Sequence, residues 1–541
     1  MIDPENSPEN IPLFPSDYRG SGLLLPVTSL PSSYGIGDVG PAAFDWIDRL
    51  QASGQNWWQA LLLGPPEYGS APYQCSSSFA GNWLSISPDF LIQDELLRTA
   101  DCEGCSFSSA FIDYDVVVPF KHYLLDVAWA NYSGGARQDL KNDFESFRHE
   151  HAYWLDDHAL FRALKAKFGG VHYLEWPAEF VLRTPAAMAQ ARRELAALID
   201  KISFAQFLLF RRARGLKDYA HARGVQLIGD LPFFVSADSS DVWARPEYFL
   251  LDENRRPRVV AGVPPDCLSS LGQVWGNPVY NWDALREDGY QWFIERFRTA
   301  LAQVDVVRLD HFRGFAAAWH VPAGAPSARC GQWVPGPVAG IFAAVQKEFG
   351  WLPFIAEDLG MITADVWHLL DQIETPGTRV LQLAFDGHSD NPHRPENYVV
   401  NTVAYTGTND NPTTRAWCEK LPAHQRRNLW QYLRRPEGDA ADAAPSLMRL
   451  AWASRAALAM APLQDLLNLA PDASVNVPGN GGANWPWRAT DDMLNAHAFE
   501  WLRQLTKGAK RAGSPDKPQV SEVHDDQQQP CQSGIAGVPV R

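Results

Sequence analysis

Short apolar runs recur along the chain, and polar or charged side chains follow each run within a few residues. The runs lie near residues 23, 58, 226, 306, 354, 381, 401 and 458. Such runs, bounded by turn residues, are typical of strands buried on both faces of a parallel sheet. Other segments repeat apolar residues every three or four positions, which predicts amphipathic helices over 41–52, 283–304, 338–349, 363–373 and 415–434.

Strands that alternate with helices predict an α/β protein, because a parallel strand needs a crossover connection. Eight strand–helix units predict a closed (β/α)8 TIM barrel with large helical and loop insertions between strands. A doubly wound open sheet is the alternative, but neither a GxGxxG motif nor a P-loop follows any early strand.

The same pattern divides the chain into a barrel domain, its insertions and two terminal segments. We expect a flexible N-terminal segment over 1–18, a catalytic barrel over 19–507 and a disordered tail over 508–541, where Gly, Ser, Pro, Gln and Lys dominate. The barrel is interrupted by a mainly helical insertion at about 85–222, with helical patterns at 153–167 and 187–215. A second insertion, at about 236–282, is long enough to be a substrate loop.

The composition and charge of the chain limit which kinds of partner it can bind. The net charge of -16 argues against nucleic acid, whose phosphates would be repelled. The first 20 residues lack the basic and apolar parts of a signal peptide, and no apolar run is long enough to span a bilayer, so we expect no membrane partner and a cytoplasmic location. The CxxC formed by Cys102 and Cys105 has no second pair at zinc-ribbon spacing, which predicts reduced thiols.

The most informative stretch is 304–313, where an apolar strand ends in Arg308, Asp310, His311 and Arg313. Burying charge costs several kcal/mol unless each charge is paired, so four ionisable residues at the end of an ordinary core strand would lower stability. Ionisable residues are expected where a barrel strand ends at the catalytic face. Arg308, two residues before Asp310, shares its face and should hold it anionic, so Asp310 is a candidate nucleophile.

Three further acids follow other strands. Asp230, Glu357 and Asp410 come after the runs near 226, 354 and 401. Each alone could be a helix cap or one half of an ion pair. Two carboxyl groups across a barrel mouth, however, can catalyse glycoside hydrolysis, provided that their pKa values differ. Glu357 has no basic neighbour and precedes Asp358, which makes it the candidate proton donor.

The motifs around these acids resemble the four ordered regions of the α-amylase clan. They read Gly-Asp230-Leu-Pro, Arg308-Leu-Asp310-His-Phe-Arg-Gly, Ala-Glu357-Asp-Leu-Gly and Thr-Gly-Thr-Asn409-Asp410-Asn. Segments 22–40, 68–82, 234–247, 260–280 and 462–468 are more narrowly similar to the amylomaltases, the 4-α-glucanotransferases of glycoside hydrolase family 77. The resemblance runs from about residue 19 to residue 507.

This resemblance implies a retaining double displacement that moves α-1,4-glucan segments to the 4-OH of an acceptor. Donors would be maltooligosaccharides and starch- or glycogen-derived glucans, with glucose as a further acceptor and no metal or other cofactor. Asp310 would be the nucleophile, Glu357 the acid/base and Asp410 a third acid that grips the sugar. The implied substrate-binding residues are Tyr73, Asp230, Asp266, Trp275, Arg308, His311, Asn409 and Asn484.

Several positions depart from the family pattern. Asn409 stands where the family usually has histidine, and Pro412 where an acid is common. Ser70-Ala71 replaces a usual Asp-Ser, and Cys267-Leu268 an aromatic pair.

Two alternatives therefore stay open: an α-glucan hydrolase of the same clan, and a glucan-binding barrel with weakened catalysis. The rim loops 68–82 and 259–282 favour transfer, because they would bury the acceptor and keep water out. The sequence carries no signal for an oligomeric state.

Overall fold

Eight parallel strands form a closed barrel in the computed structural model, which describes residues 12–61, 64–65, 75–265, 269–476 and 485–512. The predicted (β/α)8 fold is confirmed. Around the barrel the strands pair in the order β1, β12, β11, β10, β9, β6, β3 and β2. Their bounds are β1 (Gly20–Leu24), β2 (Trp57–Gln59), β3 (Gln226–Leu231), β6 (Val306–Leu309), β9 (Phe354–Ala356), β10 (Gly377–Val380), β11 (Thr402–Tyr405) and β12 (Leu458–Pro462).

The strands are buried on both faces, as their continuous apolar runs predict. In β6, Val306 and Val307 have no exposed surface, and burying each contributes roughly 1.5–3 kcal/mol. Helices cover the outside of the barrel. The first, α1 (Pro41–Ala52), has the predicted bounds: proline suits its first position, and Gly54 follows its end at a φ of +73°.

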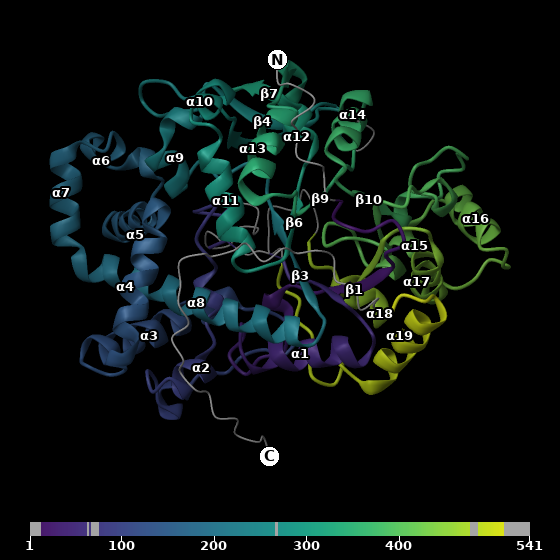
Figure 1. The fold of residues 1–541 in the computed structure, drawn as a ribbon, viewed down its shortest axis with the longest axis horizontal. Helices are drawn as coiled ribbons and strands as arrows, with labels where there is room; N and C mark the ends of the chain where they lie inside the picture. Colours follow the sequence, from purple (N-terminus) through teal and green to yellow (C-terminus); the bar gives the residue numbers. More distant parts are fainter. Residues whose placement is uncertain (1–11, 62–63, 66–74, 266–268, 477–484, 513–541) are drawn as a thin grey trace.

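Helices also follow most of the later strands. They are α11 (Gln291–Leu301), α13 (Ala339–Phe349), α14 (Ala364–Ile373), α15 (Thr414–Lys420), α16 (Ala423–Tyr432), α17 (Ala443–Ala453), α18 (Leu463–Leu466) and α19 (Ala496–Gly508). In Figure 1 the last of them, yellow α19, lies beside α17 and α18 at the lower right.

The segment between β2 and β3 is helical wherever it is regular. Figure 1 shows its helices in blue, gathered on one side of the barrel, with α8 running from there under the strands. They are α2 (Pro88–Gln93), α3 (Tyr114–Ser133), α4 (Lys141–Glu150), α5 (Ala152–Lys167), α6 (Ala178–Val181), α7 (Pro185–Glu194) and α8 (Ala196–Ala222). The predicted helix over 187–215 is therefore two helices, α7 and α8, which meet at Leu195, outside the helical backbone region.

Two other predicted helices are also divided. The helix expected over 283–304 is α10 (Trp282–Glu287) followed by α11, because Gly289 and Tyr290 both adopt positive φ. The helix expected over 415–434 breaks between α15 and α16 at Pro422, which lacks an N–H and disfavours helix in the residue before it.

The strand expected near 381 lies earlier in the chain, as β10. Its last residue, Val380, pairs with Tyr405, the last residue of β11. After Val380 the chain turns into a short 3-10 helix, Leu381–Leu383.

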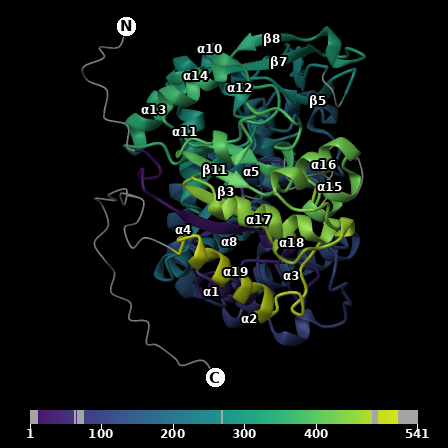
Figure 2. The same cartoon turned by 90° about the vertical axis from the view of Figure 1, so that its right-hand side faces the viewer.

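A second sheet occupies part of the region predicted as loop. It is antiparallel, in the order β5 (Gln273–Pro278), β4 (Val259–Val263), β7 (Ala317–Pro322) and β8 (Gln332–Pro335). The short helix α9 (Ser240–Ala244) precedes the sheet in sequence, and α12 (Arg313–Ala316) lies between β5 and β7. Because α12 and β7 follow directly from the end of β6, the sheet stands at the carboxyl end of the barrel, opposite α1 and α19 in Figure 2.

Within the described ranges, none of the helices combines the length and apolar character needed to cross a bilayer. The predicted segment boundaries stay predictions. Part of segment 1–18 is described and packs on the barrel: Leu13, Phe14 and Tyr18 are buried, and the Tyr18 hydroxyl accepts a hydrogen bond from the Trp57 indole at 2.7 Å.

Candidate active site

The carboxyl ends of three adjacent barrel strands carry the first cluster of ionisable groups. In β3 and β6, Asp230 lies directly opposite Arg308. In β6 and β9, Leu309 lies opposite Ala356, so the residues that follow them, Asp310 and Glu357, leave the barrel side by side. Parallel pairing thus gathers at one edge four groups that are separated in sequence.

Arg308 holds this cluster together. Its side chain is 1% exposed, and its Nη1 donates to both carboxylate oxygens of Asp230 at 2.8 Å and to Oδ1 of Asp310 at 3.2 Å. A buried guanidinium is tolerated only when paired in this way, and its hydrogen bonds to ionised partners are strong. The predicted contact between Arg308 and Asp310 is present, with Asp230 as the stronger partner.

Burial has the largest effect on the pKa of Asp310. It raises this pKa to about 7, against the charge of Arg308, and the charges of Asp230 and Asp410 act in the same direction as burial. Arg308 favours the ionised form of Asp310, in the predicted direction, but burial outweighs it, so the expectation that Arg308 keeps Asp310 anionic stays a prediction. About a quarter of the Asp310 side chain is exposed at the barrel mouth.

Glu357 is oriented by backbone groups. The N–H of His311 donates to its Oε2 at 2.8 Å, and the N–H of Leu359 donates to its Oε1 at 3.1 Å. Burial raises the pKa of Glu357 well above its usual value; the charge of Arg308 opposes this, and that of Asp310 adds to it. A carboxyl that keeps its proton near neutral pH can serve as a general acid.

Behind Glu357 a buried ion pair joins β9 to β10. The Asp358 carboxylate accepts the Thr378 N–H at 2.7 Å and the Arg379 Nη1 at 2.6 Å. Asp358 therefore supports the strand end on which Glu357 stands, while its charge also raises the pKa of Glu357.

His311 follows Asp310 in the left-handed region, at a φ of +52°, which turns its ring toward the second sheet. There Trp275 of β5 meets it edge-on, with ring centroids 4.9 Å apart, and Phe234 lies at 6.1 Å. Burial lowers the pKa of His311 to about 4, with the charge of Arg313 acting in the same direction. At neutral pH His311 is thus an uncharged donor or acceptor that lies beside Trp275.

Asp410 stands across the barrel mouth, on the loop after β11. Its N–H donates to the Thr408 hydroxyl at 3.2 Å, and its Oδ1 accepts Nδ2–H of Asn476 at 2.7 Å. The preceding Asn409 is 2% exposed. Sequence reasoning missed Asn476, because it lies 66 positions away in an irregular loop that carries no local pattern.

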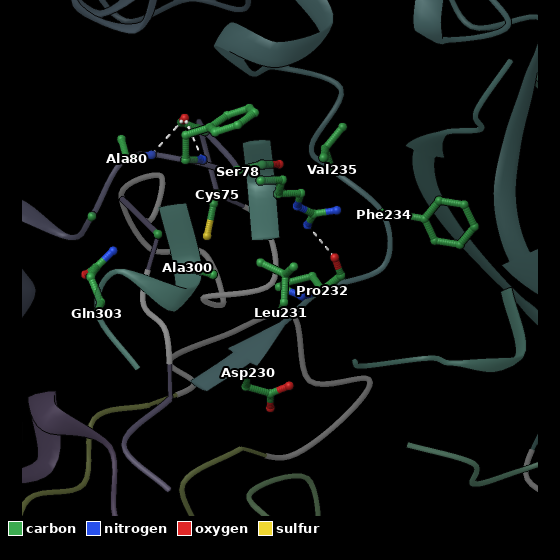
Figure 3. Close-up of a pocket in the computed structure, with 15 residues that line it drawn as sticks. Cys75, Ser78, Ala80, Asp230, Leu231, Pro232, Phe234, Val235, Ala300 and Gln303 are labelled. Atoms are coloured by element: carbon green, nitrogen blue, oxygen red, sulfur yellow. Dashed lines mark hydrogen bonds between the residues drawn. The ribbon is translucent and has the colours of Figure 1, made fainter. Parts of the chain in front are cut away.

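A cavity lies beside the cluster (Figure 3). Residues from β3, from α11 and from the loop 75–81 line it, and Asp230 stands at one end of it, below Leu231 and Pro232. Arg296 of α11 reaches into this wall and donates to the Pro232 carbonyl, which fixes the chain just after β3.

Three implied binding residues, Tyr73, Asp266 and Asn484, lie outside the described residues, as do the departures Ser70-Ala71 and Cys267-Leu268. Among the residues that the structure describes, no group of three or more His, Cys, Asp or Glu side chains could hold a metal ion. The carboxyl pair itself can supply both a nucleophile and an acid.

The chain is similar to known proteins over most of its length. A family model described as 4-alpha-glucanotransferase matches residues 25–494. The 4-alpha-glucanotransferase of Thermus thermophilus is 41% identical over 501 residues, covering 91% of this chain and 99% of the relative. That of Aquifex aeolicus is 42% identical over 484 residues, covering 89% and 97%.

A solved structure is similar over the same length. The amylomaltase from Streptococcus agalactiae, in complex with acarbose, has a TM-score of 0.87 and 34% identity, covering 91% of this chain and 99% of that one. The fold and the sequence thus match the same group of enzymes. The chain belongs to the 4-alpha-glucanotransferase family, glycoside hydrolase family 77, as its motifs predict.

Proposed function

We propose that the barrel mouth transfers glucan segments by a retaining double displacement, with Asp310 as nucleophile, Glu357 as acid/base and Asp410 as the third acid. The observation that carries the proposal is the pairing of Asp310 and Glu357 at neighbouring strand ends. Burial raises the pKa of Asp310 to about 7 and that of Glu357 well above its usual value, and we assign the proton to Glu357 and the ionised state to Asp310 for the first step.

In the first step an oxygen of ionised Asp310 attacks the anomeric carbon of the donor glucan. The bond from that carbon to the glycosidic oxygen breaks, and Glu357 gives its proton to the leaving oxygen. In the second step the acceptor 4-OH gives its proton to Glu357 and attacks the same carbon, which releases Asp310. Two inversions leave the anomeric configuration unchanged.

The other groups bind and orient the sugar. Arg308 and Asp230 fix Asp310, while neutral His311 and half-buried Trp275 offer a hydrogen bond and an aromatic face at the donor site. Asp410, held by Asn476, accepts hydrogen bonds from sugar hydroxyls, which strengthen as the ring distorts. Tyr73, Asp266, Asn409 and Asn484 complete the proposed binding set.

The substrates follow from the family. The similar Streptococcus agalactiae structure is a complex with acarbose, and for this chain we propose a glucan ligand at the barrel mouth. Maltooligosaccharides and starch- or glycogen-derived segments are the proposed donors, and glucose is a further acceptor. Incorporation of labelled glucose into maltose and longer sugars tests glucose as acceptor.

Maltotriose alone tests the activity. Transfer yields glucose together with a ladder of longer oligomers, whereas hydrolysis yields only shorter products and a binding protein yields none. The proposal fails if the ladder is absent. The reaction as proposed uses no metal, so EDTA should leave the ladder unchanged.

A cytoplasmic location is part of the proposal. Cys102 and Cys105, which are close in sequence, form no disulfide, as suits a reducing compartment. Cell fractionation with antibody detection tests it, and sedimentation of the purified protein measures the oligomeric state.

A further inference from the structure

The loop that carries Asp410 is fastened at both ends to one buried carboxylate. Asp465, on α18 just after β12, is 2% exposed. Its Oδ2 accepts the hydroxyl of Thr406 and the hydroxyl of Thr414, each at 2.6 Å. Its Oδ1 accepts the N–H of Thr414 at 2.8 Å. Thr406 is the first residue after β11, and Thr414 is the first residue of α15, so Asp465 closes the loop 406–414 into a ring.

Nothing in the core explains a carboxylate at this position. In the described part of the chain no lysine or arginine forms an ion pair with Asp465, and its partners are two hydroxyls and one amide. A buried carboxylate without a countercharge costs stability, and an apolar side chain of similar size would avoid that cost. Three hydrogen bonds to one buried carboxyl group, however, fix the geometry of the groups that make them.

The interior of the loop is tied in the same manner. Thr408 donates from both its N–H and its hydroxyl to Oδ1 of Asn411, at 2.9 Å each, and the Asp410 N–H donates to that same hydroxyl. Gln382, just after β10, donates to the Pro412 carbonyl at 3.0 Å and to the Thr414 hydroxyl at 3.2 Å. With its ends and interior fixed, the loop presents Asp410 at one position.

We infer that Asp465 is a positioning residue for the transfer reaction: by holding Thr406 and Thr414, it sets where the Asp410 carboxylate meets the sugar. The inference rests on the role proposed above for Asp410. Asp465 itself does not touch the substrate; it acts through the loop.

Valine and serine at position 414 give the sharpest test. Thr414→Val keeps the shape but removes the hydroxyl from Asp465, and should lower kcat for maltotriose by about tenfold to a hundredfold. Thr414→Ser keeps the hydroxyl and should stay within about threefold of the parent. Asp465→Asn and Thr406→Val should lower kcat as well, with a smaller change in KM, since the grip of Asp410 strengthens in the transition state.

Thr506→Val is the matched control. Thr506 of α19 is fully buried, and its hydroxyl accepts hydrogen bonds from Gln55 and Trp452 at 2.8 and 2.9 Å. It lies at the opposite end of the barrel, so its loss should lower the thermal midpoint with no change in kcat per folded enzyme.

A double-mutant cycle separates positioning from packing. With maltosyl fluoride as an activated donor, Thr414→Val should cost little more in an Asp410→Asn enzyme, because its effect acts through Asp410. The inference is overturned if the two losses multiply, if Thr414→Ser is as slow as Thr414→Val, or if Thr414→Val behaves like the Thr506 control. An Asp410→Asn enzyme that is as fast as the parent would instead overturn the proposed role of Asp410.

Discussion

On one side of the barrel mouth a buried arginine holds the carboxylates. On the other side, no arginine or lysine among the described residues pairs with Asp465, the buried acid that fastens the loop 406–414. We call the first the arginine side; it comprises Asp230, Arg308, Asp310 and Glu357 at the ends of β3, β6 and β9. The second, here the threonine side, comprises Thr406, Asp410, Thr414 and Asp465 beyond β11 and β12.

The difference matches the work proposed for each side. Bond exchange needs two carboxyls of unequal proton affinity, and dense charge with burial produces such unequal values. Gripping a distorted sugar needs an acid at a fixed place, and hydrogen bonds from neutral groups provide that. On the arginine side, charge and burial therefore set the pKa values of the carboxyl groups. On the threonine side, hydrogen bonds from neutral groups fix the position of the acid.

Asp310→Asn should have the largest effect. The variant cannot form a glycosyl-enzyme, so kcat should fall by about 10,000-fold or more, measured as glucose released from maltotriose. Asp283→Asn, an exposed position on α10, is the control. A variant that kept more than about a hundredth of parental kcat would show that Asp310 is not the nucleophile.

Glu357→Gln should lose about 100- to 10,000-fold on maltotriose, because the leaving oxygen no longer receives a proton. Fluoride needs no proton to leave, so the first step with maltosyl fluoride should return to near the parental rate. Stopped-flow release of fluoride measures that step. Equal losses on both donors would argue against Glu357 as the acid.

Asn476→Ala tests whether the threonine side depends on the hydrogen bond that holds Asp410. It removes one hydrogen bond to ionised Asp410, and kcat should fall by about tenfold to a hundredfold. Asn131→Ala, which removes a similar bond from Nδ2 to the Leu96 carbonyl within the helical insertion, should leave kcat unchanged. If the two variants were equally active, Asn476 would have no part in holding Asp410.

The pH dependence of kcat/KM and of stability tests the arginine side without a substitution. Asp310 must be ionised to attack, and its pKa is raised to about 7, so kcat/KM should fall about tenfold per pH unit below pH 7. Stability changes in the opposite sense: the folded state holds this proton between about pH 4 and pH 7 while the unfolded chain does not. The contribution of Asp310 to the free energy of unfolding therefore decreases as the pH rises through that window.

A flat kcat/KM profile between pH 5 and pH 8 would contradict this assignment. The proposed mechanism requires Glu357 to stay protonated in the same range, and burial raises its pKa in that direction. Because the two carboxyls interact, the limbs of the profile belong to the pair.

Asn409→His should have the smallest effect. Histidine is the usual family residue, and a restored hydrogen bond would raise kcat/KM. Asn409, however, is 2% exposed, so the larger ring would have to displace the side chains packed around it. We expect a lower thermal midpoint and a change in kcat/KM within about tenfold; a gain of a hundredfold would show that the loop can accommodate the ring.

The two sides also differ in how far sequence could predict them. Asp230, Arg308, Asp310 and Glu357 stand at strand ends, and the apolar runs that locate the strands locate them too. The count of eight strands and the family motifs were sufficient to predict the barrel and this cluster.

Sequence could not predict the supports of Asp410. Asn476 and Asp465 lie 66 and 55 positions from it, in an irregular loop and a four-residue helix whose place depends on barrel closure. The sharing of Arg308 between two acids likewise depends on strand register, and the raised pKa of Asp310 depends mainly on its burial; apolar patterning specifies neither. The second sheet escaped prediction because half of the residues of β5 are exposed, so that no alternation marks the strand.

The most direct test of this division of labour is to trap the glycosyl-enzyme. Glu357→Gln incubated with maltosyl fluoride should form the intermediate and then stall, because no base activates the acceptor. After acid quenching and proteolysis, mass spectrometry should find one maltosyl group, on the peptide that contains Asp310. A label on Asp410, or a free product of inverted configuration with no labelled peptide, would contradict the account.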